Sequence, residues 1–242
     1  MSRHPVDKLR AGEIVLRGEV AHHLRQVLRA RVGQRVILFD AQSSEAEAEI
    51  VALAQGAVTV RAGEPRVVSR ESPLALTLAF ALSKGDKPEW IAQKAVELGV
   101  RRLVLFAAER SIVRWAPADA ARKIERMEAV IRGAAAQCGR NVLPDFAYAA
   151  STAEAASRLA DHARRVALHP EAASPLAALL KEEDGPLALL CGPEGGLSPD
   201  EVSLLRGHGW RFATLGPRIL RAETATLAAV TIAQSRIGDL KG

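Results

Sequence analysis

The chain has 242 residues, 48% of them apolar and 25% charged, which is typical of a globular protein with a sizeable core and room for one large or two small domains. No apolar run approaches the roughly 20 residues that a membrane-spanning helix needs, and the polar N-terminus predicts no secretory signal. Two cysteines, Cys138 and Cys191, are too few for a disulfide framework or a zinc site. We therefore expect a cytoplasmic protein without a bound metal.

The positive charge is concentrated at the start of the chain. The formal net charge is +5, and residues 1–35 hold eight Lys and Arg against three Asp and Glu, so the rest of the chain is balanced. A basic leading segment is typical of a protein that binds nucleic acid, although a solvated basic face has the same composition. Aromatic residues make up only 4% of the chain, so base stacking on an aromatic platform is not expected.

The first 70 residues predict a small all-β domain with one helix. Strands this close together, without helices between them, favour a barrel or sandwich. A helix is expected over 19–30, where Val20, Leu24, Val27 and Leu28 share one face. Residues 64–73 are polar, contain two prolines and are expected to be a linker. The strands are expected at 13–18, 34–41, 45–54 and 57–63.

From residue 74 onward strands and helices alternate, which predicts a parallel α/β sheet with helices on both faces. Residues 74–82 and 186–191 are continuous apolar runs, as expected for strands that are covered on both faces. The remaining strands are expected at 101–108, 164–169 and 211–216. The helices are expected at 88–99, 118–138, 152–163, 174–183, 198–209 and 222–240.

Two loops in this alternation are candidates for a ligand site. The first, GPEGG at 192–196, leads into a helix whose start is explained by Ser198 as N-cap and Glu201 as its capping-box partner. The second, LGPRIL at 215–220, leads into the closing helix, where the cation of Arg221 opposes the helix dipole. Both loops follow predicted parallel strands, at the edge where open α/β sheets bind ligands.

These loops match none of the common nucleotide or catalytic motifs. The chain has no GxxxxGK[ST] phosphate loop, no GxGxxG dinucleotide fingerprint, no GxSxG nucleophile elbow and no HExxH metal motif. His22 and His23 are adjacent, point away from each other on a helix and are poor co-ligands for a metal. The sequence therefore argues against a P-loop NTPase, an ordinary Rossmann dehydrogenase, a common serine hydrolase and a zinc enzyme.

Together with QCGRN at 137–141, the two loops resemble the RsmE family of 16S ribosomal RNA methyltransferases, which belong to the SPOUT superfamily of knotted methyltransferases. The resemblance also covers residues 22–40, 82–100 and LHP at 168–170, in the same order and over nearly the whole chain. It implies an α/β fold with a SPOUT-type parallel sheet and a C-terminal trefoil knot, preceded by a small PUA-like RNA-binding β-barrel. The implied domains are 1–70 and 73–242.

The resemblance also implies an activity. This is methyl transfer from S-adenosylmethionine to N3 of a uridine, the family's uridine 1498, in the 16S rRNA of the small ribosomal subunit. Apolar side chains would enclose the adenine of the cofactor, and backbone groups would contact its edge. The cofactor positions carried over are Leu168, Gly192, Glu194, Gly196, Leu215, Gly216, Ile219, Leu220, Arg221 and Thr224.

The catalytic candidates are Arg221, Arg140 and Glu194. Either arginine could stabilise the charge that develops on O2 and O4 when N3 loses its proton, and Glu194 could accept that proton or orient the base. Gln137 and Arg140 could instead serve the end of helix 118–138. The expected RNA contacts are Arg3, Arg25, Arg29, Lys84, Lys87, Arg110, Gln137 and Arg140.

Two departures from the family affect the RNA contacts. The start SRHPV lacks the aromatic residues that often follow the first arginine, and Ala136 stands where the family often has a charged residue. Two alternatives also remain open. One is another SPOUT specificity, such as ribose 2′-O-methylation, and the other is a non-catalytic RNA-binding protein that keeps the fold.

A homodimer is also implied, because SPOUT enzymes usually have their sites near a subunit interface. The closing helix 222–240 is the expected contact. Its stripe of side chains could equally belong to the core of one subunit. These side chains are Leu227, Val230, Thr231 and Gln234.

Overall fold

The computed structural model describes residues 1–40, 43–181 and 185–240, in which the chain forms two compact units. The grouping of residues 132–143 with the first of these units was not expected from the sequence. The two units comprise Met1–Glu71 with Arg132–Leu143, and Ser72–Ile131 with Pro144–Gly242.

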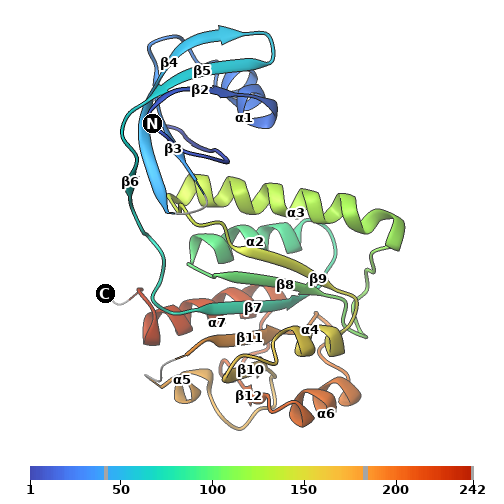
Figure 1. Cartoon of the computed structure of the whole chain (residues 1–242). Helices are drawn as coiled ribbons and strands as arrows, with labels where there is room; N and C mark the ends of the chain where they lie inside the picture. The colour runs from blue at the N-terminus through green and yellow to red at the C-terminus, as the bar shows by residue number, and fades with distance from the viewer. Residues whose placement is uncertain (41–42, 182–184, 241–242) are drawn as a thin grey trace. The chain divides into compact units, whose positions relative to one another are not determined.

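The first unit is built on one six-stranded sheet (Figure 1). Its strands lie in the order β1-β3-β4-β5-β2, with β6 paired to β4, and only β1 and β3 pair in parallel. Alternate side chains such as Val36, Leu38 and Ile50 are fully buried and form the core of this unit with Leu24 and Val60. The strands are β1 (Arg3–Pro5), β2 (Gly12–Leu16), β3 (Arg35–Phe39), β4 (Ser44–Ala54), β5 (Ala57–Ala62) and β6 (Arg66–Val67).

The helix predicted over 19–30 is only partly α-helical. Helix α1 (Gly18–His22) continues into a π-helical turn, η1 (His23–Val27). A π-helical turn takes more residues than an α-helical one, so side chains spaced for an α-helix no longer share one face. Leu24 is fully buried as predicted, whereas Val27 and Leu28 are exposed, which corrects the predicted apolar stripe.

The second unit is a six-stranded sheet in which every neighbouring pair of strands is parallel, as predicted. The strand order is β12-β10-β11-β7-β8-β9. The strands are β7 (Leu76–Ala81), β8 (Arg102–Phe106), β9 (Asp145–Ala149), β10 (Arg164–Leu168), β11 (Leu187–Cys191) and β12 (Arg211–Ala213). The helices are α2 (Lys87–Glu97), α3 (Pro117–Cys138), α4 (Thr152–Arg158), α5 (Leu176–Leu179), α6 (Pro199–Gly207) and α7 (Ala222–Ile237).

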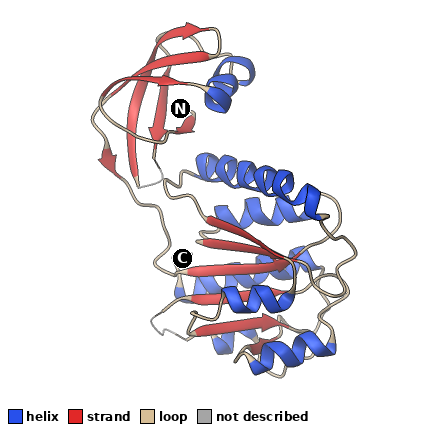
Figure 2. Cartoon of the chain, turned by 45° about the vertical axis from the view of Figure 1, so that its right-hand side comes forward, coloured by secondary structure: helices blue, strands red, loops and turns tan. Residues whose placement is uncertain are grey.

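Helices cover both faces of this sheet (Figure 2). Helix α7 packs against α2, α5 and β11, whereas α4 packs against α6, β8 and β9. Strands β7 and β11 are buried along their whole length, which confirms the reading of their continuous apolar runs. In contrast, β9 lies at the edge of the sheet and is mostly half-buried, so its residues carry no continuous apolar signal, and the sequence analysis missed it.

Two predicted helices are shorter in the structure. Of the helix expected over 174–183, residues 182–183 lie outside the described residues, and 174–181 contain only the four helical residues of α5. The helix expected over 152–163 ends at Arg158. The start of α6 is as predicted. Ser198 accepts a hydrogen bond from the Glu201 N–H at 3.2 Å, and the Glu201 carboxylate accepts one from the Ser198 N–H at 2.8 Å.

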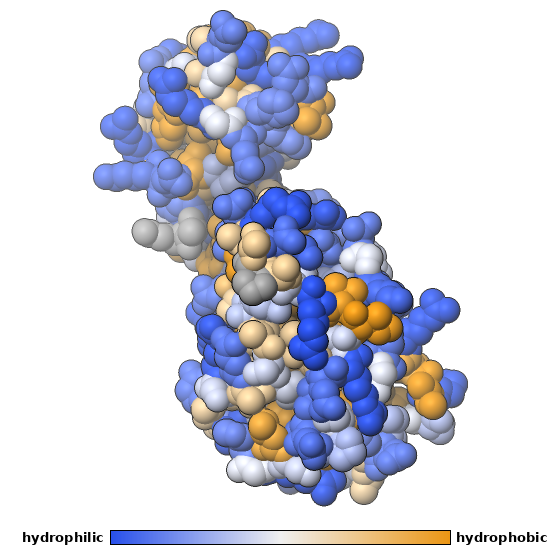
Figure 3. Space-filling view, turned by 90° about the vertical axis from the view of Figure 1, so that its right-hand side faces the viewer, coloured by the Kyte–Doolittle hydropathy of each residue, from blue (hydrophilic) through white to orange (hydrophobic). Residues whose placement is uncertain are grey.

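The surface is mainly hydrophilic, with separate apolar groups, as Figure 3 shows for one face. Large apolar side chains with more than a third of their area exposed include Val27, Trp90, Ile112 and Ile219. Over the ranges that the structure describes, no helix combines the length and apolar character needed to cross a membrane.

Candidate active site

A cavity of about 920 Å³ lies at the carboxyl ends of three neighbouring strands, β10, β11 and β12. The loops that follow these strands form most of its wall, together with one side of α6, the first turn of α7 and Arg110 from the loop after β8. Both loops singled out in the sequence, 192–196 and 215–220, therefore enclose the same space. Small-molecule sites usually have volumes of about 300–1,000 Å³, so this cavity suits a ligand of cofactor size.

The structure brings nearly all of the predicted cofactor positions into this cavity. Gly216 and Thr224 belong to the same loop and helix but do not line it. Ile219 is 91% exposed, so its side chain stands out from the wall rather than packing into it. The predicted positions that do line the cavity are Leu168, Gly192, Glu194, Gly196, Leu215, Ile219, Leu220 and Arg221.

The geometry of the chain itself favours glycine at two positions of the first loop. A Cβ atom on Gly192 would come within 3.1 Å of the Leu197 side chain, and Gly196 has a φ of +70°, which other residues rarely adopt. Arg110 donates a hydrogen bond to the Gly195 carbonyl at 3.2 Å and so ties two neighbouring loops together. This leaves a stretch of bare backbone in the cavity wall, whose polar groups a ligand can approach.

Glu194 forms an ion pair that the sequence did not suggest. The ammonium group of Lys87 donates a hydrogen bond to Glu194 Oε1 at 2.9 Å and lies 3.3 Å from Glu223 Oε2. Burial by itself would raise the pKa of Glu194, but the hydrogen bond from Lys87 and the charges of Lys87 and Lys84 outweigh it, so this pKa is lowered. Glu194 is therefore held as a carboxylate in the cavity wall.

Arg221 is available for a ligand. It is the N-cap residue of α7, its side chain caps no backbone group, and it lines the cavity. Within the described part of the chain, its exposed guanidinium group has no hydrogen-bond or ion-pair partner. A cation placed in this way, next to the carboxylate-bearing loop, suits a negatively charged or polarised group on a substrate.

Arg140 and Gln137 belong to the first unit, whereas Arg221 and Glu194 belong to the second. The Arg140 side chain is 3% exposed and donates two hydrogen bonds to the Glu71 carboxylate, one of them from Nε to Oε1 at 2.9 Å. Gln137 is exposed. The structure thus gives the guanidinium group of Arg140 a carboxylate partner within its own unit.

Arg3 is also paired inside the first unit. Its side chain is 11% exposed, its Nη2 donates to Glu45 Oε2 at 2.9 Å and to the Asn141 side chain, and its guanidinium carbon lies 5.4 Å from the centre of the Phe39 ring. Glu45 is buried and also accepts a hydrogen bond from Arg70 at 3.1 Å. This network joins the strands of the first unit to the segment after α3, which explains why that segment groups with them.

The other predicted RNA contacts have accessible side chains. Arg29, Lys84 and Arg110 are exposed, and Arg25 is half-buried. Arg29 has a φ of +47°, an uncommon conformation for a residue other than glycine, just after the π-helical turn. The basic start of the chain therefore presents Arg25 and Arg29 on an irregular turn, while Arg3 is turned inward.

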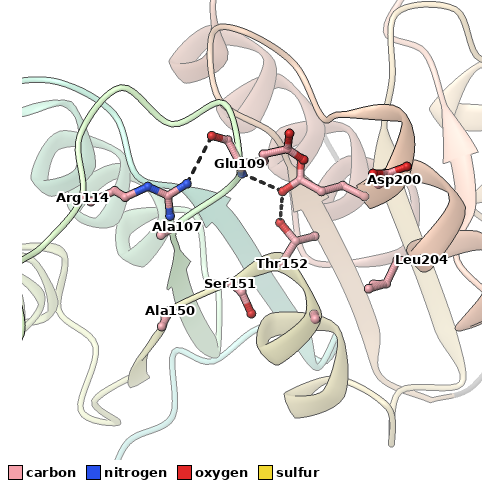
Figure 4. A pocket seen from close by; sticks show the side chains of 10 residues that line it. Ala107, Glu109, Arg114, Ala150, Ser151, Thr152, Asp200 and Leu204 are labelled. Carbon is pink, nitrogen blue, oxygen red and sulfur yellow. Dashed lines mark hydrogen bonds between the residues drawn. The ribbon is translucent and has the colours of Figure 1, made fainter.

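Glu201 does more than cap α6. Its carboxylate also accepts a hydrogen bond from the Glu109 N–H at 2.8 Å and one from the Thr152 hydroxyl at 2.5 Å (Figure 4). A second cavity of about 310 Å³ lies here, lined in part by Glu201, Arg114 and Glu109. No sequence signal could have linked Glu201 to Glu109 and Thr152, which lie 92 and 49 residues away in the chain.

Comparisons with known proteins agree with this architecture. Residues 70–234 match the family described as "RNA methyltransferase domain", and residues 16–62 match "RNA methyltransferase PUA domain". The chain is similar to a ribosomal RNA small subunit methyltransferase E of Bacillus subtilis, with 33% identity over 93% of this chain and 91% of that protein. It is also similar to one of Mycobacterium tuberculosis, with 30% identity over 92% of this chain and 87% of that protein.

Solved structures show the same likeness. A methyltransferase from Legionella pneumophila in complex with SAM has a TM-score of 0.92 and 34% identity, covering 99% of this chain and 98% of that one. A ribosomal RNA small subunit methyltransferase E from Neisseria gonorrhoeae, bound to S-adenosyl methionine, has a TM-score of 0.93 and 30% identity over the whole of both chains. Fold and cavity thus define an RNA methyltransferase with a PUA domain. The chain belongs to the ribosomal RNA small subunit methyltransferase E family, which confirms the resemblance seen in its loops.

Proposed function

We propose that this protein transfers a methyl group from S-adenosylmethionine to N3 of uridine 1498 in the 16S rRNA of the small ribosomal subunit. Membership of the family supports methylation of small-subunit rRNA, and the relatives from Legionella and Neisseria support the cofactor. The observation that carries the proposal is the backbone-walled cavity at the ends of β10, β11 and β12, which gathers nearly all the cofactor positions.

The cavity fits this cofactor in size and chemistry. Three apolar side chains line it beside the bare backbone of the glycine loop: Leu168 at the end of β10, and Leu215 and Leu220 from the loop after β12. Such a wall suits an adenine ring, which needs apolar faces and backbone partners along its edge. The exposed Ile219 would close over the ring, and Gly216 and Thr224 would shape the loop and helix start behind it. The bound cofactor supplies a methyl group on a positively charged sulfur.

The residues of the chain supply the rest of the chemistry. N3 of uridine is a weak nucleophile while it keeps its proton, so a base must take that proton as the new bond forms. Glu194 is the proton acceptor in our proposal, and Arg221 stabilises the negative charge that develops on O2 and O4 of the base. The N3–carbon bond forms as the carbon–sulfur bond breaks, with the electron pair of that bond staying on sulfur.

The RNA contacts are revised by the placement of the arginines. Arg25, Arg29, Lys84, Arg110 and Gln137 keep accessible side chains and remain our proposed RNA contacts. Lys87 is paired with two carboxylates and is withdrawn from this set.

Arg3 and Arg140 are also withdrawn from the RNA contacts, and Arg140 from the catalytic set. Each guanidinium group is already paired with a buried or half-buried carboxylate of the first unit. Removing Arg140 would take this cation from the Glu71 carboxylate, and breaking such a buried pair costs about 3–5 kcal/mol. Removing Arg3 would take one of the three arginines that surround the buried Glu45 carboxylate, the other two being Arg66 and Arg70. A structural role accounts for both residues.

Three structural expectations accompany this proposal. We infer an RNA-binding barrel domain over 1–70 and a methyltransferase domain over 73–242 that ends in a trefoil knot. Strand β11 lies between β7 and β10, which both precede it in the chain. This strand order suits a knot, in which a later segment passes between earlier ones. A chain pulled from both ends should keep a tightened knot and reach a shorter length than the roughly 3.3–3.6 Å per residue of an extended chain.

The direct test is mass spectrometry of nucleosides. Small ribosomal subunits from a strain without the corresponding methyltransferase gene are incubated with the protein and S-adenosylmethionine, and the 16S rRNA is digested. The expected product is 3-methyluridine at position 1498. Appearance of a 2′-O-methylated nucleoside instead would contradict the N3 assignment and favour the ribose specificity.

An inactive variant makes this test specific. Arg221→Ala should leave the fold intact, because its side chain is exposed and has no partner in the described part of the chain. We expect product formation to fall by about 10²-fold or more with this variant, as for the loss of one charge-stabilising group. A variant as active as the unaltered protein would remove Arg221 from the mechanism.

A further inference from the structure

Lys87 stands between two carboxylates that come from different parts of the second unit. Lys87 is the first residue of α2, Glu194 belongs to the glycine loop after β11, and Glu223 lies in the first turn of α7. The Lys87 Nζ atom is 2.9 Å from Glu194 Oε1 and 3.3 Å from Glu223 Oε2. Three segments that are remote in sequence therefore meet at one ammonium group.

The two carboxylates differ in their surroundings. Glu194 lines the cofactor cavity, with 31% of its side chain exposed. Glu223 does not line that cavity and is 17% exposed, and its Oε2 atom is buried and accepts no hydrogen bond from the described residues. The ion pair with Lys87 therefore compensates the charge of Glu223, and Glu223 in turn fixes Lys87.

We propose that Lys87 is a positioning residue: anchored on Glu223, its ammonium group holds the Glu194 carboxylate in the cavity wall, in place to take the N3 proton. This inference rests on the proposed function, in which Glu194 accepts that proton. The reaction step needs no groups other than the uridine, Glu194 and S-adenosylmethionine. The N3–H bond breaks, the proton goes to Glu194, the bond from N3 to the methyl carbon forms, and the carbon–sulfur pair stays on sulfur.

The charges around Glu194 keep its carboxylate ionised, which a proton acceptor requires. The cations facing it come from α2 and the loop before α2, and hydrogen bonding and charge from these lysines lower its pKa. The hydrogen bond that Lys87 donates to Glu194 is, in turn, the largest of the effects that raise the pKa of Lys87. The charged groups on the cavity wall and on the segments that pair with Glu194 are Lys84, Lys87, Arg110, Glu171, Arg206, Arg218, Arg221 and Glu223.

A contact from Lys87 to an RNA phosphate is the competing role. Two carboxylates already offset the charge of this ammonium group, so a phosphate brought beside it would meet two negative charges as well as the cation. Lys84, three residues earlier, is exposed and has no ion pair in the described part of the chain. Lys84 is therefore the better phosphate contact, and Lys87 the better partner for Glu194.

The experiment compares Lys87→Met and Lys87→Arg with the unaltered protein in the 3-methyluridine assay on small subunits. We expect Lys87→Met to lower kcat by about tenfold or more, a part of the 10²–10⁴-fold that a positioned base contributes. The acidic limb of the kcat profile should move to higher pH, because loss of the lysine charge raises the pKa of Glu194. Affinity for S-adenosylmethionine, measured by calorimetry, should stay within about twofold. Lys87→Arg keeps the charge and should restore part of the rate.

Lys94 provides a matched control. It lies on the same helix, is similarly exposed and pairs with Glu97 at 2.8 Å, outside the cavity. Lys94→Met should leave kcat and the pH profile unchanged. In addition, Glu223→Gln should lower kcat in the unaltered protein but have no further effect in Lys87→Met, because Glu223 acts only through Lys87.

Three results would overturn the inference. The first is that Lys87→Met has the same kcat and the same acidic limb of the pH profile as the unaltered protein. The second is that Lys87→Met loses activity and cofactor affinity by the same factor. The third is that Lys87→Met changes only KM for the RNA, and that KM depends less on salt. The last would indicate a phosphate contact. The proposed function is judged separately, by whether the unaltered protein forms 3-methyluridine. A different methylated nucleoside would overturn the function and, with it, the role of Lys87.

Discussion

The carboxylate of Glu201 accepts the backbone N–H of Glu109 at 2.8 Å, although 92 residues separate the two in the chain. The same carboxylate caps helix α6 through Ser198 and binds the Thr152 hydroxyl. It thereby connects three segments: the loop that carries Arg110, the end of the glycine loop, and the start of α4. A residue that looks like an ordinary helix cap in sequence is a junction between these segments, beside the cavity at the ends of β10, β11 and β12.

Glu201→Gln should therefore destabilise the protein more than the loss of a surface carboxylate would. The amide keeps one acceptor oxygen but turns an NH₂ group toward donors, so a buried N–H is left without a partner. We expect the free energy of unfolding to fall by about 1.5–3 kcal/mol, as measured by urea denaturation. Glu125→Gln, on the exposed side of α3, is the control and should change it by less than about 0.5 kcal/mol. Equal effects of the two changes would contradict this role.

The buried carboxylate of Glu45 makes the stability of the first unit depend on pH. Burial by itself would raise the pKa of Glu45, but hydrogen bonds from Arg70, Arg3 and Asn141 and the charge of Arg3 outweigh it and lower the pKa from 4.5 to about 2. A lowered folded-state pKa means that the stabilisation is complete above about pH 4.5 and is lost as the pH falls toward 2.

Glu45→Gln should thus be less stable than the unaltered protein at neutral pH, by on the order of 3 kcal/mol. The difference in unfolding free energy between the two should narrow steadily as the pH is lowered from about 4.5 to 2. Chemical denaturation at a series of pH values measures it. Glu49→Gln, at an exposed position on the same strand, should show no such trend. A constant difference across this range would show that the charge of Glu45 is not what stabilises the unit.

If the basic start of the chain binds RNA, the double change Arg25→Glu with Arg29→Glu should weaken RNA binding. It should also weaken the salt dependence of binding: the slope of log binding constant against log salt concentration should become shallower by about one unit for each lost phosphate contact. Binding titrations at several salt concentrations measure both quantities. Cofactor affinity should not change, because neither arginine lines the cavity. Arg158→Glu with Arg211→Glu alters the net charge equally on the second unit, and an equal effect there would indicate a general charge effect only.

The expected homodimer can use only part of helix α7. Val230 and Gln234 are fully buried, and Gln234 bonds to the Ser72 hydroxyl at 2.7 Å and to the Leu98 carbonyl at 2.8 Å. These two side chains belong to the core of one chain, whereas Thr231 is exposed.

We expect sedimentation equilibrium to give a mass of about twice the 25.9 kDa of one chain. Thr231→Arg should shift this mass toward that of a single chain without changing the unfolding transition. Ser157→Arg, at an exposed position on α4, is the control and should leave the dimer intact. A mass of one chain for the unaltered protein would exclude the dimer.

Much of this protein follows from neighbours in sequence. The continuous apolar runs at β7 and β11 mark strands buried on both faces, and the spacing of Ser198 and Glu201 sets the start of α6. The two glycine-containing loops, each after a strand and before a helix, predict a ligand cavity at one edge of the sheet. These features depend on a period or a cap within a few residues, so the amino-acid order determines them.

Tertiary structure decided the pairing of charges. Nothing in the sequence indicates that Lys87 meets Glu194 across 107 residues, that Arg140 meets Glu71 across 69, or that Arg3 meets Glu45 across 42. A guanidinium or ammonium group has no directional preference along the chain, so its partner depends on which carboxylate the fold brings within about 3 Å. For this reason sequence motifs located the cavity, while only the folded chain separated the arginines and lysines that face a ligand from those already paired.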